Sequence, residues 1–380
     1  MLDQKQVFDT LAAHGVTFFT GVPDSYLNGF CNYALANCSD RNVITANEGN
    51  AVALAAGHYF ASKEIPLVYL QNSGMGITVN PLVSLADRDV YAVPMLLLIG
   101  WRGQVKDGVN TEPKHPQHKL QGEITPTLLD VMHIPYTVLE DDDIKFAETV
   151  AKAIAYCRGT RQPYALIAPK GVMADPDKPN NMDDVYPMSR EEAIEVILDQ
   201  MPRDTIYSAT TGRATRELYW LRERRGESKA TDFLNVGSMG HASSAALGMA
   251  LAKPDRHVVV LDGDSACIMH MGAMTMVSKV HAPNYMHVVL NNGAHESVGG
   301  QPSAGHRIDL TRIAEGCGYM TVGHAVTAKD ELIEAVHVLS RSKKAAFIDV
   351  RIHKGLKGKL PPLDFDHRGA IDALMDELHK

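Results

Sequence analysis

Two aspartates that lie one residue apart follow an apolar run in the second half of the chain. The run is Val258–Leu261, and the two carboxylates are Asp262 and Asp264. An unbroken apolar run of this kind is typical of a buried parallel strand, bounded here by a turn that contains Gly263. Carboxylates at such a strand end can bind a metal ion, carry a phosphoryl group or stabilise a turn. The residues of this stretch alone leave all three interpretations open.

An asparagine pair, Asn291 and Asn292, lies further along the chain. Carboxylate and amide oxygens are the hard ligands that Mg²⁺ takes, commonly together with phosphate oxygens. Two strand ends at one edge of a sheet can hold such side chains close together. An aspartate-nucleophile phosphohydrolase is disfavoured, because its D-x-D motif would lie late in the chain and its downstream lysine and acidic pair are not evident. A turn aspartate beside an unrelated asparagine pair is the remaining alternative.

Short apolar runs alternate with helical patterns on both sides of a proline-rich segment, which predicts parallel sheets covered by helices on both faces. We therefore predict an α/β protein with two doubly wound parallel-sheet domains, 1–174 and 189–380, joined by a linker over 175–188. Ser189 and Glu192 predict a capped helix at the start of the second domain. The predicted strands are 16–21, 42–46, 66–71, 93–100, 164–169, 204–210, 232–237, 257–262, 286–292 and 345–352.

Composition limits the class of protein. Of the 380 residues, 45% are hydrophobic and 22% are charged, as in a globular protein. The net charge of −8 argues against nonspecific binding to nucleic acid. No apolar run approaches the ~20 residues that span a bilayer, and no secretory signal is evident at the N-terminus. The five scattered cysteines indicate reduced thiols, so we expect a cytoplasmic protein without membrane contact.

The spacing of Gly263-Asp264-Ser265 and Asn291-Asn292 resembles the signature of the thiamine-diphosphate enzymes, in which Gly-Asp-Gly precedes Asn-Asn by a spacer of similar length. The resemblance implies an N-terminal domain that binds the aminopyrimidine ring and a C-terminal domain that binds diphosphate and Mg²⁺. It implies that Asp264, the side-chain carbonyl of Asn292 and the backbone carbonyl of Ala294 hold the metal. Amide dipoles of the helix after Asp264 would face the diphosphate.

Other stretches extend this resemblance over essentially the whole chain. In "ITANEGNAVALAAGHYFA", Glu48 lies where the family has the glutamate that hydrogen-bonds N1′ of the aminopyrimidine, and burial should raise its pKa. In "VGSMGHASS", Gly237 would offer its carbonyl to the 4′-amino group, and Met239 would support the bent cofactor. Each of these residues also has an ordinary structural interpretation, as a helix-capping charge or part of a turn. The other residues implied at the cofactor are Asn72, Ser73, Thr210, Thr211, Gly263, Ser265 and Ala266.

The absence of a middle domain between the two halves resembles the small 2-oxo acid decarboxylases of this family. The resemblance implies decarboxylation of 3-phosphonopyruvate to phosphonoacetaldehyde and CO₂, a step of phosphonate biosynthesis, with sulfopyruvate as the alternative substrate. It also implies at least a dimer, with each active site between subunits. The cations of the loop-like segment 100–122 suit an anionic substrate, although a solvated basic loop would look the same. The candidate substrate residues are Asp24, Ser25, Arg102, Lys114, His115 and His295.

Two other classes are weighed against this interpretation. A nucleotide-dependent oxidoreductase would need G-x-G-x-x-G after an early strand, which "GVPDSYLNG" does not provide. A non-catalytic binding module is suggested by Ser265, where the signature has glycine, but such a module has no need of Glu48. If position 265 required a positive φ, serine would be strained by ~1 kcal/mol or more. We instead expect Ser265 in the first turn of a helix, with its hydroxyl near the diphosphate.

Overall fold

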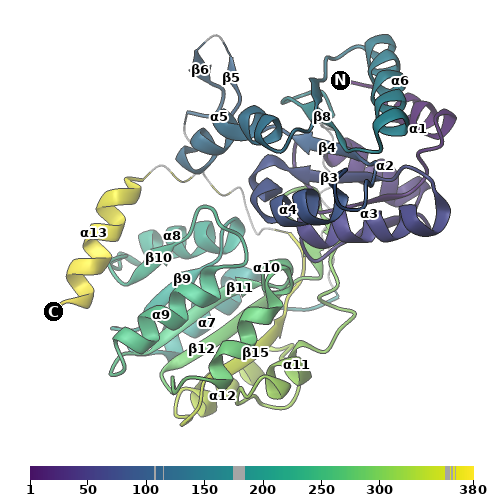
Figure 1. Ribbon diagram of the computed structural model, residues 1–380. Coiled ribbons are helices and arrows are strands. Elements are labelled where there is room, and N and C mark those ends of the chain that lie inside the picture. Colours follow the sequence, from purple (N-terminus) through teal and green to yellow (C-terminus); the bar gives the residue numbers. More distant parts are fainter. Residues whose placement is uncertain (107, 114, 174–184, 356–359, 361–362, 364) are drawn as a thin grey trace. The chain divides into compact units, whose positions relative to one another are not determined.

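The computed structural model describes residues 1–106, 108–113, 115–173, 185–355, 360, 363 and 365–380. The chain divides into two compact units, Met1–Pro179 and Asn180–Lys380. Each unit is built around its own parallel sheet with helices on both faces, as the ribbon in Figure 1 shows. The prediction of an α/β protein with two parallel-sheet units is confirmed. Most of the predicted linker, which includes 175–184, lies outside the described residues.

The first unit contains a six-stranded sheet in the order β2-β1-β3-β4-β8-β7, and all its pairings are parallel. A small antiparallel hairpin, β5 with β6, accompanies it. The strands are β1 (Phe19–Gly21), β2 (Asn42–Ile44), β3 (Leu67–Gln71), β4 (Leu96–Gly100), β5 (Val105–Lys106), β6 (Val109–Asn110), β7 (Tyr136–Val138) and β8 (Tyr164–Ala168). The helical elements are α1 (Gln4–Ala13), α2 (Asn28–Asn37), α3 (Glu48–Ser62), η1 (Asn72–Gly74), α4 (Met75–Pro81), η2 (Leu82–Ala86), α5 (Pro116–Val131) and α6 (Asp143–Thr160).

The second unit contains a five-stranded parallel sheet in the order β10-β9-β11-β12-β15. Its strands, with the short hairpin β13–β14, are β9 (Ile206–Ala209), β10 (Asp232–Leu234), β11 (Val258–Gly263), β12 (Tyr285–Asn291), β13 (Ala294–His295), β14 (Gln301–Pro302) and β15 (Ala346–Arg351). Its helical elements are α7 (Arg190–Gln200), α8 (Arg213–Arg225), α9 (Ala242–Ala252), α10 (Asp264–Met269), η3 (Met271–Ser278), α11 (Leu310–Gly316), α12 (Lys329–Leu339) and α13 (His367–Leu378).

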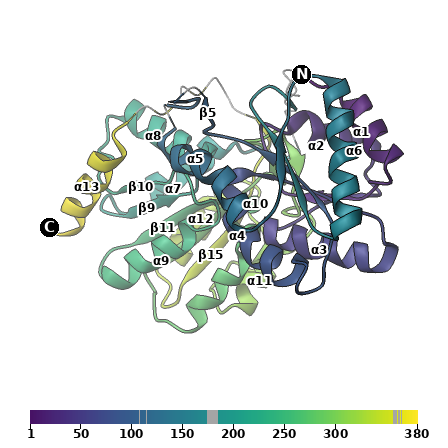
Figure 2. The same cartoon turned by 45° about the horizontal axis from the view of Figure 1, so that its top comes forward.

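Successive residues of each strand enter opposite cores. In β11, Val259 and Leu261 pack with α7, α8 and α12, whereas Val258 and Val260 pack with α9 and α11. This alternation follows from the pleat of the strand, and because helices cover both faces the strand is apolar throughout. The first unit is built in the same way, with α1 and α6 side by side over one face in both views of the ribbon (Figures 1 and 2). Rigid, doubly covered sheets fix where each strand ends.

Most predicted strands are present, and the differences lie in short strands and in one helix. The capping box at Ser189 and Glu192 is confirmed, with reciprocal side-chain to backbone hydrogen bonds of 3.2 and 2.9 Å at the start of α7. The short strand β7 was not predicted. The segment 100–122 was expected to be a loop, but α5 begins at Pro116, where proline suits the first turn of a helix. Across the described ranges, every helix is too short or too polar to cross a membrane.

The end of β1 buries a carboxylate inside the first unit. Asp24 is fully buried, its Oδ2 accepts the N–H of Tyr26 at 3.0 Å, and Gly100 leaves room for it because a side chain at position 100 would overlap this oxygen. Oδ1 has no hydrogen-bond partner among the described residues. Burial raises the pKa of Asp24 to about 6, against the opposing charge of Arg102. The folded chain therefore holds this proton more tightly than an unfolded chain does.

We predict that Asp24 makes the protein less stable as the pH rises from about 4 to about 6. In that interval the unfolded chain loses the Asp24 proton before the folded chain does, so the free energy of unfolding falls, by up to about 3 kcal/mol in all. Asp24→Asn should lack this loss and gain stability relative to the wild type at neutral pH. Urea unfolding of both proteins across this pH range measures the difference, and parallel pH profiles would contradict the assignment.

Candidate functional site

The predicted metal residues lie at the ends of adjacent strands in the second unit. Strand β11 pairs with β9 on one side and with β12 on the other, in parallel register. Thr210 follows β9, Asp264 follows β11 and Asn292 follows β12, so all three leave the sheet at the same edge. Ligands bind at this edge in doubly wound sheets. The prediction that the aspartate and the asparagine pair share one strand-end region agrees with this topology.

Asp264 is the first residue of α10 and is almost completely buried, at 2% exposure. The Ser303 hydroxyl donates to its Oδ2. Burial raises the pKa of Asp264 to about 6, despite the hydrogen bond from Ser303 and backbone N–H groups. The carboxylate therefore lies in a dry environment that supplies little compensating charge. A divalent cation is the kind of partner that such a carboxylate needs.

The two asparagines have different roles. The Asn291 amide donates to the carbonyl of Gly305 and to Oδ1 of Asp349, at 3.0 Å each, and so ties β12 to its surroundings. The Asn292 Nδ2 donates to Oε2 of Glu296 at 2.8 Å, while its Oδ1 accepts the N–H of Ala294 at 3.1 Å. An amide oxygen accepts through two lone pairs, so Oδ1 of Asn292 keeps one for a further partner. Asn292 is thus the member of the pair that suits a metal.

Two hydroxyl groups beside Asp264 lie buried with their hydrogen-bonding capacity unused. Within the part of the chain that the structure describes, neither Thr210 Oγ1 nor Ser265 Oγ has a partner. Gly263 lies next to open space, since the nearest atom to a β-carbon built there is Thr210 Cγ2 at 4.0 Å. Buried polar groups are normally satisfied, so these two donors fit a ligand with acceptor oxygens. A metal-bound diphosphate has such oxygens, and the residues present fit that group.

Ser265 lies inside α10, and its φ is not among the positive values of the described residues. The expectation of a helical Ser265 is confirmed, so serine is not strained in place of the signature glycine. Its neighbour Ala266 is buried in the same turn, and Thr211 is half-buried after Thr210. The roles of these residues toward a cofactor stay predictions.

The other aspartate of the opening pair has a structural partner. Asp262 Oδ2 and His287 Nε2 lie 3.0 Å apart, both buried, and Oδ1 accepts the N–H of Gly263. Cys267 approaches them closely enough to complete a set of three metal-binding side chains. Burial raises the pKa of the Cys267 thiol well above its usual range, which disfavours the thiolate that a metal needs. Asp262 and His287 therefore form a buried hydrogen-bonded pair.

The segment after β10 forms a tight turn. Ser238 has a φ of 47° and Gly240 a φ of 83°, and Asn235 Oδ1 accepts the N–H of Gly237 at 3.1 Å. A positive φ at serine is uncommon and needs support from its surroundings. Met239 lies half-buried between these two residues. The turn can present the Met239 side chain and the Gly237 carbonyl, as the sequence predicts, but no contact to a cofactor tests those roles.

Glu48 and the segment 72–74 meet in the first unit. Glu48 is the first residue of α3, is 5% exposed, and its Oε2 has no hydrogen-bond partner among the described residues. Burial raises its pKa. A side chain at Gly74 would overlap the Glu48 carboxylate, so glycine is required for this approach. The structure brings together a buried carboxyl group with a raised pKa and the end of β3.

Asn72 is engaged by the protein itself. Its Nδ2 donates to the Arg102 carbonyl at 2.9 Å and to Thr125 Oγ1 at 3.0 Å, and its Oδ1 accepts the Arg102 N–H at 3.1 Å. The Asn72 side chain therefore ties the end of β3 to the end of β4. The hydroxyl of Ser73 accepts a hydrogen bond from Gln71. Any cofactor contact by Asn72 would have to come from its backbone or replace one of these bonds.

The candidate substrate residues are only partly brought together. Arg102 forms a two-pronged ion pair with Glu112, at 3.1 and 2.8 Å, and lies over the ring of Tyr26. His115 is exposed at the start of α5, and Ser25 is half-buried after β1. Lys114 lies outside the described residues. In the second unit, His295 is half-buried in β13, and burial lowers its pKa to about 4.

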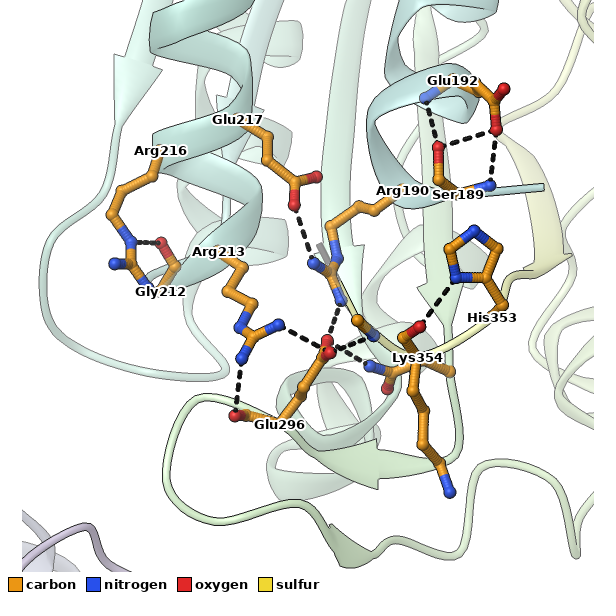
Figure 3. Close-up of polar contacts among 12 residues, drawn as sticks. Ser189, Arg190, Glu192, Gly212, Arg213, Arg216, Glu217, Glu296, His353 and Lys354 are labelled. Carbon is orange, nitrogen blue, oxygen red and sulfur yellow. Dashed lines mark hydrogen bonds and ion pairs between the residues drawn. The ribbon is translucent and has the colours of Figure 1, made fainter. Parts of the chain in front are cut away.

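Two acidic residues that the sequence did not single out organise these sites. Glu112 neutralises Arg102, and Glu296 contacts Asn292 together with Arg190 and Arg213, as Figure 3 shows for the two arginines. The only feature of the sequence that could have indicated Glu296 is its position four residues after Asn292. Its other partners are far away along the chain, so sequence spacing does not reveal them.

Comparison with known proteins agrees with this geometry. Residues 4–132 match the thiamine pyrophosphate enzyme N-terminal TPP binding domain, and residues 210–350 match the C-terminal TPP binding domain. Phosphonopyruvate decarboxylase of Streptomyces viridochromogenes is 34% identical, over 93% of this chain and 89% of that protein. Phosphonopyruvate decarboxylase of Streptomyces hygroscopicus is 33% identical over 88% and 84%. Sulfopyruvate decarboxylase of Methanosarcina acetivorans is 28% identical over 93% and 92%.

The two matched models account for the two units in the same order, and the relatives align over most of their length. Thiamine pyrophosphate is the cofactor that is also called thiamine diphosphate. The chain belongs to the thiamine pyrophosphate enzyme family.

Proposed function

We propose that this chain catalyses the decarboxylation of 3-phosphonopyruvate to phosphonoacetaldehyde and CO₂, using thiamine diphosphate and Mg²⁺. The observation that carries the proposal is the position of Asp264 and Asn292 just after the adjacent strands β11 and β12, in a chain that is 34% identical to a phosphonopyruvate decarboxylase. The reaction would take part in phosphonate biosynthesis. Sulfopyruvate decarboxylation is the second candidate, since a sulfopyruvate decarboxylase also aligns over 93% of the chain.

The metal would be held by the Asp264 carboxylate, Oδ1 of Asn292 and the carbonyl of Ala294. The donor set is made of oxygens, which Mg²⁺ prefers. The unpartnered hydroxyls of Thr210 and Ser265 would donate to diphosphate oxygens. These groups are preformed at rigid strand ends, so they would bind the cofactor without large rearrangement.

Glu48 would hold the proton at N1′ of the aminopyrimidine ring. Its buried position and raised pKa support this role, because an acid that shares a proton needs a pKa above that of an exposed glutamate. When bound, the cofactor supplies the electron sink that makes loss of CO₂ feasible. The protein's task is to bind, orient and exclude water around the reacting groups.

The substrate is a small anion, and we propose that Ser25, His115 and His295 bind it together with cations of the segment 100–122. For Arg102, Glu112 already accepts from Nε and Nη2, so a phosphonate would bind through Nη1 or compete with that carboxylate. Asp24 lies buried beneath this segment and would act through Arg102, whose charge opposes the rise in its pKa.

We also propose at least a dimer, in which Glu48 of one subunit and Asp264 of another act on the same cofactor. In support, relatives named sulfopyruvate decarboxylase subunit beta, of Methanocaldococcus jannaschii, and subunit alpha, of Methanococcus maripaludis, match 36% and 35% of this chain. Such proteins carry related segments on separate chains, so assembly between subunits is compatible with this fold.

Glu48→Gln tests the proton-holding role. The amide keeps the size of the side chain but cannot exchange the carboxyl proton, so turnover should fall by about 10²–10⁴-fold. The affinity for thiamine diphosphate, measured by calorimetry, should stay close to that of the wild type. Glu64→Gln, which changes an exposed carboxylate beyond the other end of α3, should leave turnover unchanged. Unchanged turnover in Glu48→Gln would remove Glu48 from the mechanism.

A comparison of substrates tests the proposed reaction. The value of kcat/KM should be highest for 3-phosphonopyruvate, lower for sulfopyruvate and lowest for pyruvate, which lacks the second anionic group. The enzyme is assayed with thiamine diphosphate and Mg²⁺, and CO₂ release is measured for each substrate. A preference for sulfopyruvate would replace the proposed reaction with the second candidate. Equal values for all three would show that the second anionic group is not recognised.

A further inference from the structure

Glu296 is a buried junction between four separate segments of the second unit. Its carboxylate is 11% exposed and lies in the loop between β13 and β14. Oε2 receives Arg190 Nη2 at 2.6 Å and Asn292 Nδ2 at 2.8 Å. Oε1 lies 2.6 Å from Arg213 Nη1 and also receives the N–H of Gly355. All four contacts are made by donors, and Figure 3 shows several of them converging on Glu296.

The contact with Glu296 decides which way the Asn292 amide faces. A carboxylate only accepts hydrogen bonds, so it selects the NH₂ group of Asn292 and repels its oxygen. The Ala294 N–H selects the oxygen at the other end, at 3.1 Å. The two contacts together leave Oδ1 turned away from Glu296, with one lone pair still available. This is the orientation that a metal-ligating amide requires.

The same carboxylate holds the turn after β9. Arg213 is the first residue of α8, and its Nη2 also donates to the Glu296 carbonyl at 3.3 Å. Gly212, just before it, has a φ of 104°, and a β-carbon there would lie 2.9 Å from Ser297 Oγ. Residues 296 and 297 therefore lie close to the turn that carries Thr210. The Glu296 side chain thus contacts Asn292 directly and is linked through Arg213 to the turn that carries Thr210.

Burying this carboxylate is tolerated because cations surround it. Arg190, itself buried, is shared between Glu296 and Glu217, which lies 3.0 Å from its Nη1. An ion pair of this kind is costly to break from one side, because the remaining charge stays buried. The network is therefore rigid, and it holds the Glu296 carboxylate in a fixed position relative to Asn292. Among the described residues Glu217 forms an ion pair with Arg190 but no hydrogen bond with Asn292, which makes it a matched control in the same network.

We propose that Glu296 is a positioning residue for the metal: it orients Asn292 so that Oδ1 faces the cation, and it fixes the turn after β9. The inference rests on the proposed function, in which Asp264 and Asn292 hold Mg²⁺. Residues that orient metal ligands commonly change metal affinity by about 10–100-fold when they are replaced.

Glu296→Gln tests the inference. In one orientation the NH₂ group of the glutamine faces Arg190 and Asn292, and in the other it faces Arg213 and the N–H of Gly355. An arginine therefore loses its acceptor in either orientation, and the negative charge that holds both arginines is gone. Mg²⁺ is titrated calorimetrically into metal-free protein at saturating thiamine diphosphate. The dissociation constant for Mg²⁺ should rise about 10–100-fold in Glu296→Gln and less than about threefold in Glu217→Gln. An unchanged constant in Glu296→Gln would overturn the proposal, as would equal weakening in both variants.

A double-mutant cycle with Asn292→Ala separates orientation from general structural support. If Glu296 acts through Asn292, then adding Glu296→Gln to Asn292→Ala should weaken Mg²⁺ binding by less than about threefold further. The same loss in both backgrounds would contradict the proposal. Asn292→Ala with wild-type affinity would instead contradict the metal site itself, and so the proposed function. The two failures are therefore distinguishable.

A second variant covers the case in which Glu296→Gln does not fold. Glu296→Asp keeps the negative charge between the arginines but is one methylene shorter, so it cannot contact all four donors together. Its Mg²⁺ dissociation constant should still rise, by about tenfold. Wild-type affinity in Glu296→Asp would equally overturn the proposal.

Discussion

A carboxylate buried at the end of a parallel strand is unfavourable unless donors or cations surround it, and this constraint organises the whole chain. Among the described residues Oε2 of Glu48 has no hydrogen-bond partner and Asp264 has hydrogen bonds but no ion pair, and burial raises the pKa of both. Glu296, in contrast, is surrounded by two arginines and two further donors. Asp264 and Glu48 mark places where a ligand would complete the site. Glu296 holds the residues around the Asp264 site in position.

The apolar sheets make this arrangement stable. Both faces of each sheet are covered by helices, so the strands cannot shift without disturbing two cores at once. The strand ends are therefore rigid as well, and side-chain hydrogen bonds and ion pairs fix their positions further. Asn72 joins β3 to β4, Asn291 joins β12 to Asp349, and Glu296 joins the loop after β12 to α7 and α8. The strand ends that carry the proposed cofactor residues are thus held together by side-chain hydrogen bonds and ion pairs.

Local sequence patterns were sufficient to predict an element where the residues of one segment determine its structure. The apolar runs predicted β3, β4, β11 and β12, and the helical place of Ser265 could be expected from its position after the strand. Strand β7 was missed because it has only three residues and Thr137 interrupts its apolar run. The helix that begins at Pro116 was mistaken for a loop because its cations suggested an anion site. The pairs Arg102–Glu112 and Arg213–Glu296 depend on tertiary contacts, which no local pattern encodes.

The magnesium dependence of cofactor binding shows whether the buried Asp264 carboxylate needs a cation to accept a diphosphate beside it. Thiamine diphosphate is titrated into EDTA-treated protein, with and without Mg²⁺, and the same is done for Asp264→Asn. We expect tight binding by the wild type only when Mg²⁺ is present, and weak binding by Asp264→Asn that Mg²⁺ does not improve. Tight binding by the wild type without a divalent cation, or an undiminished Mg²⁺ effect in Asp264→Asn, would contradict this expectation.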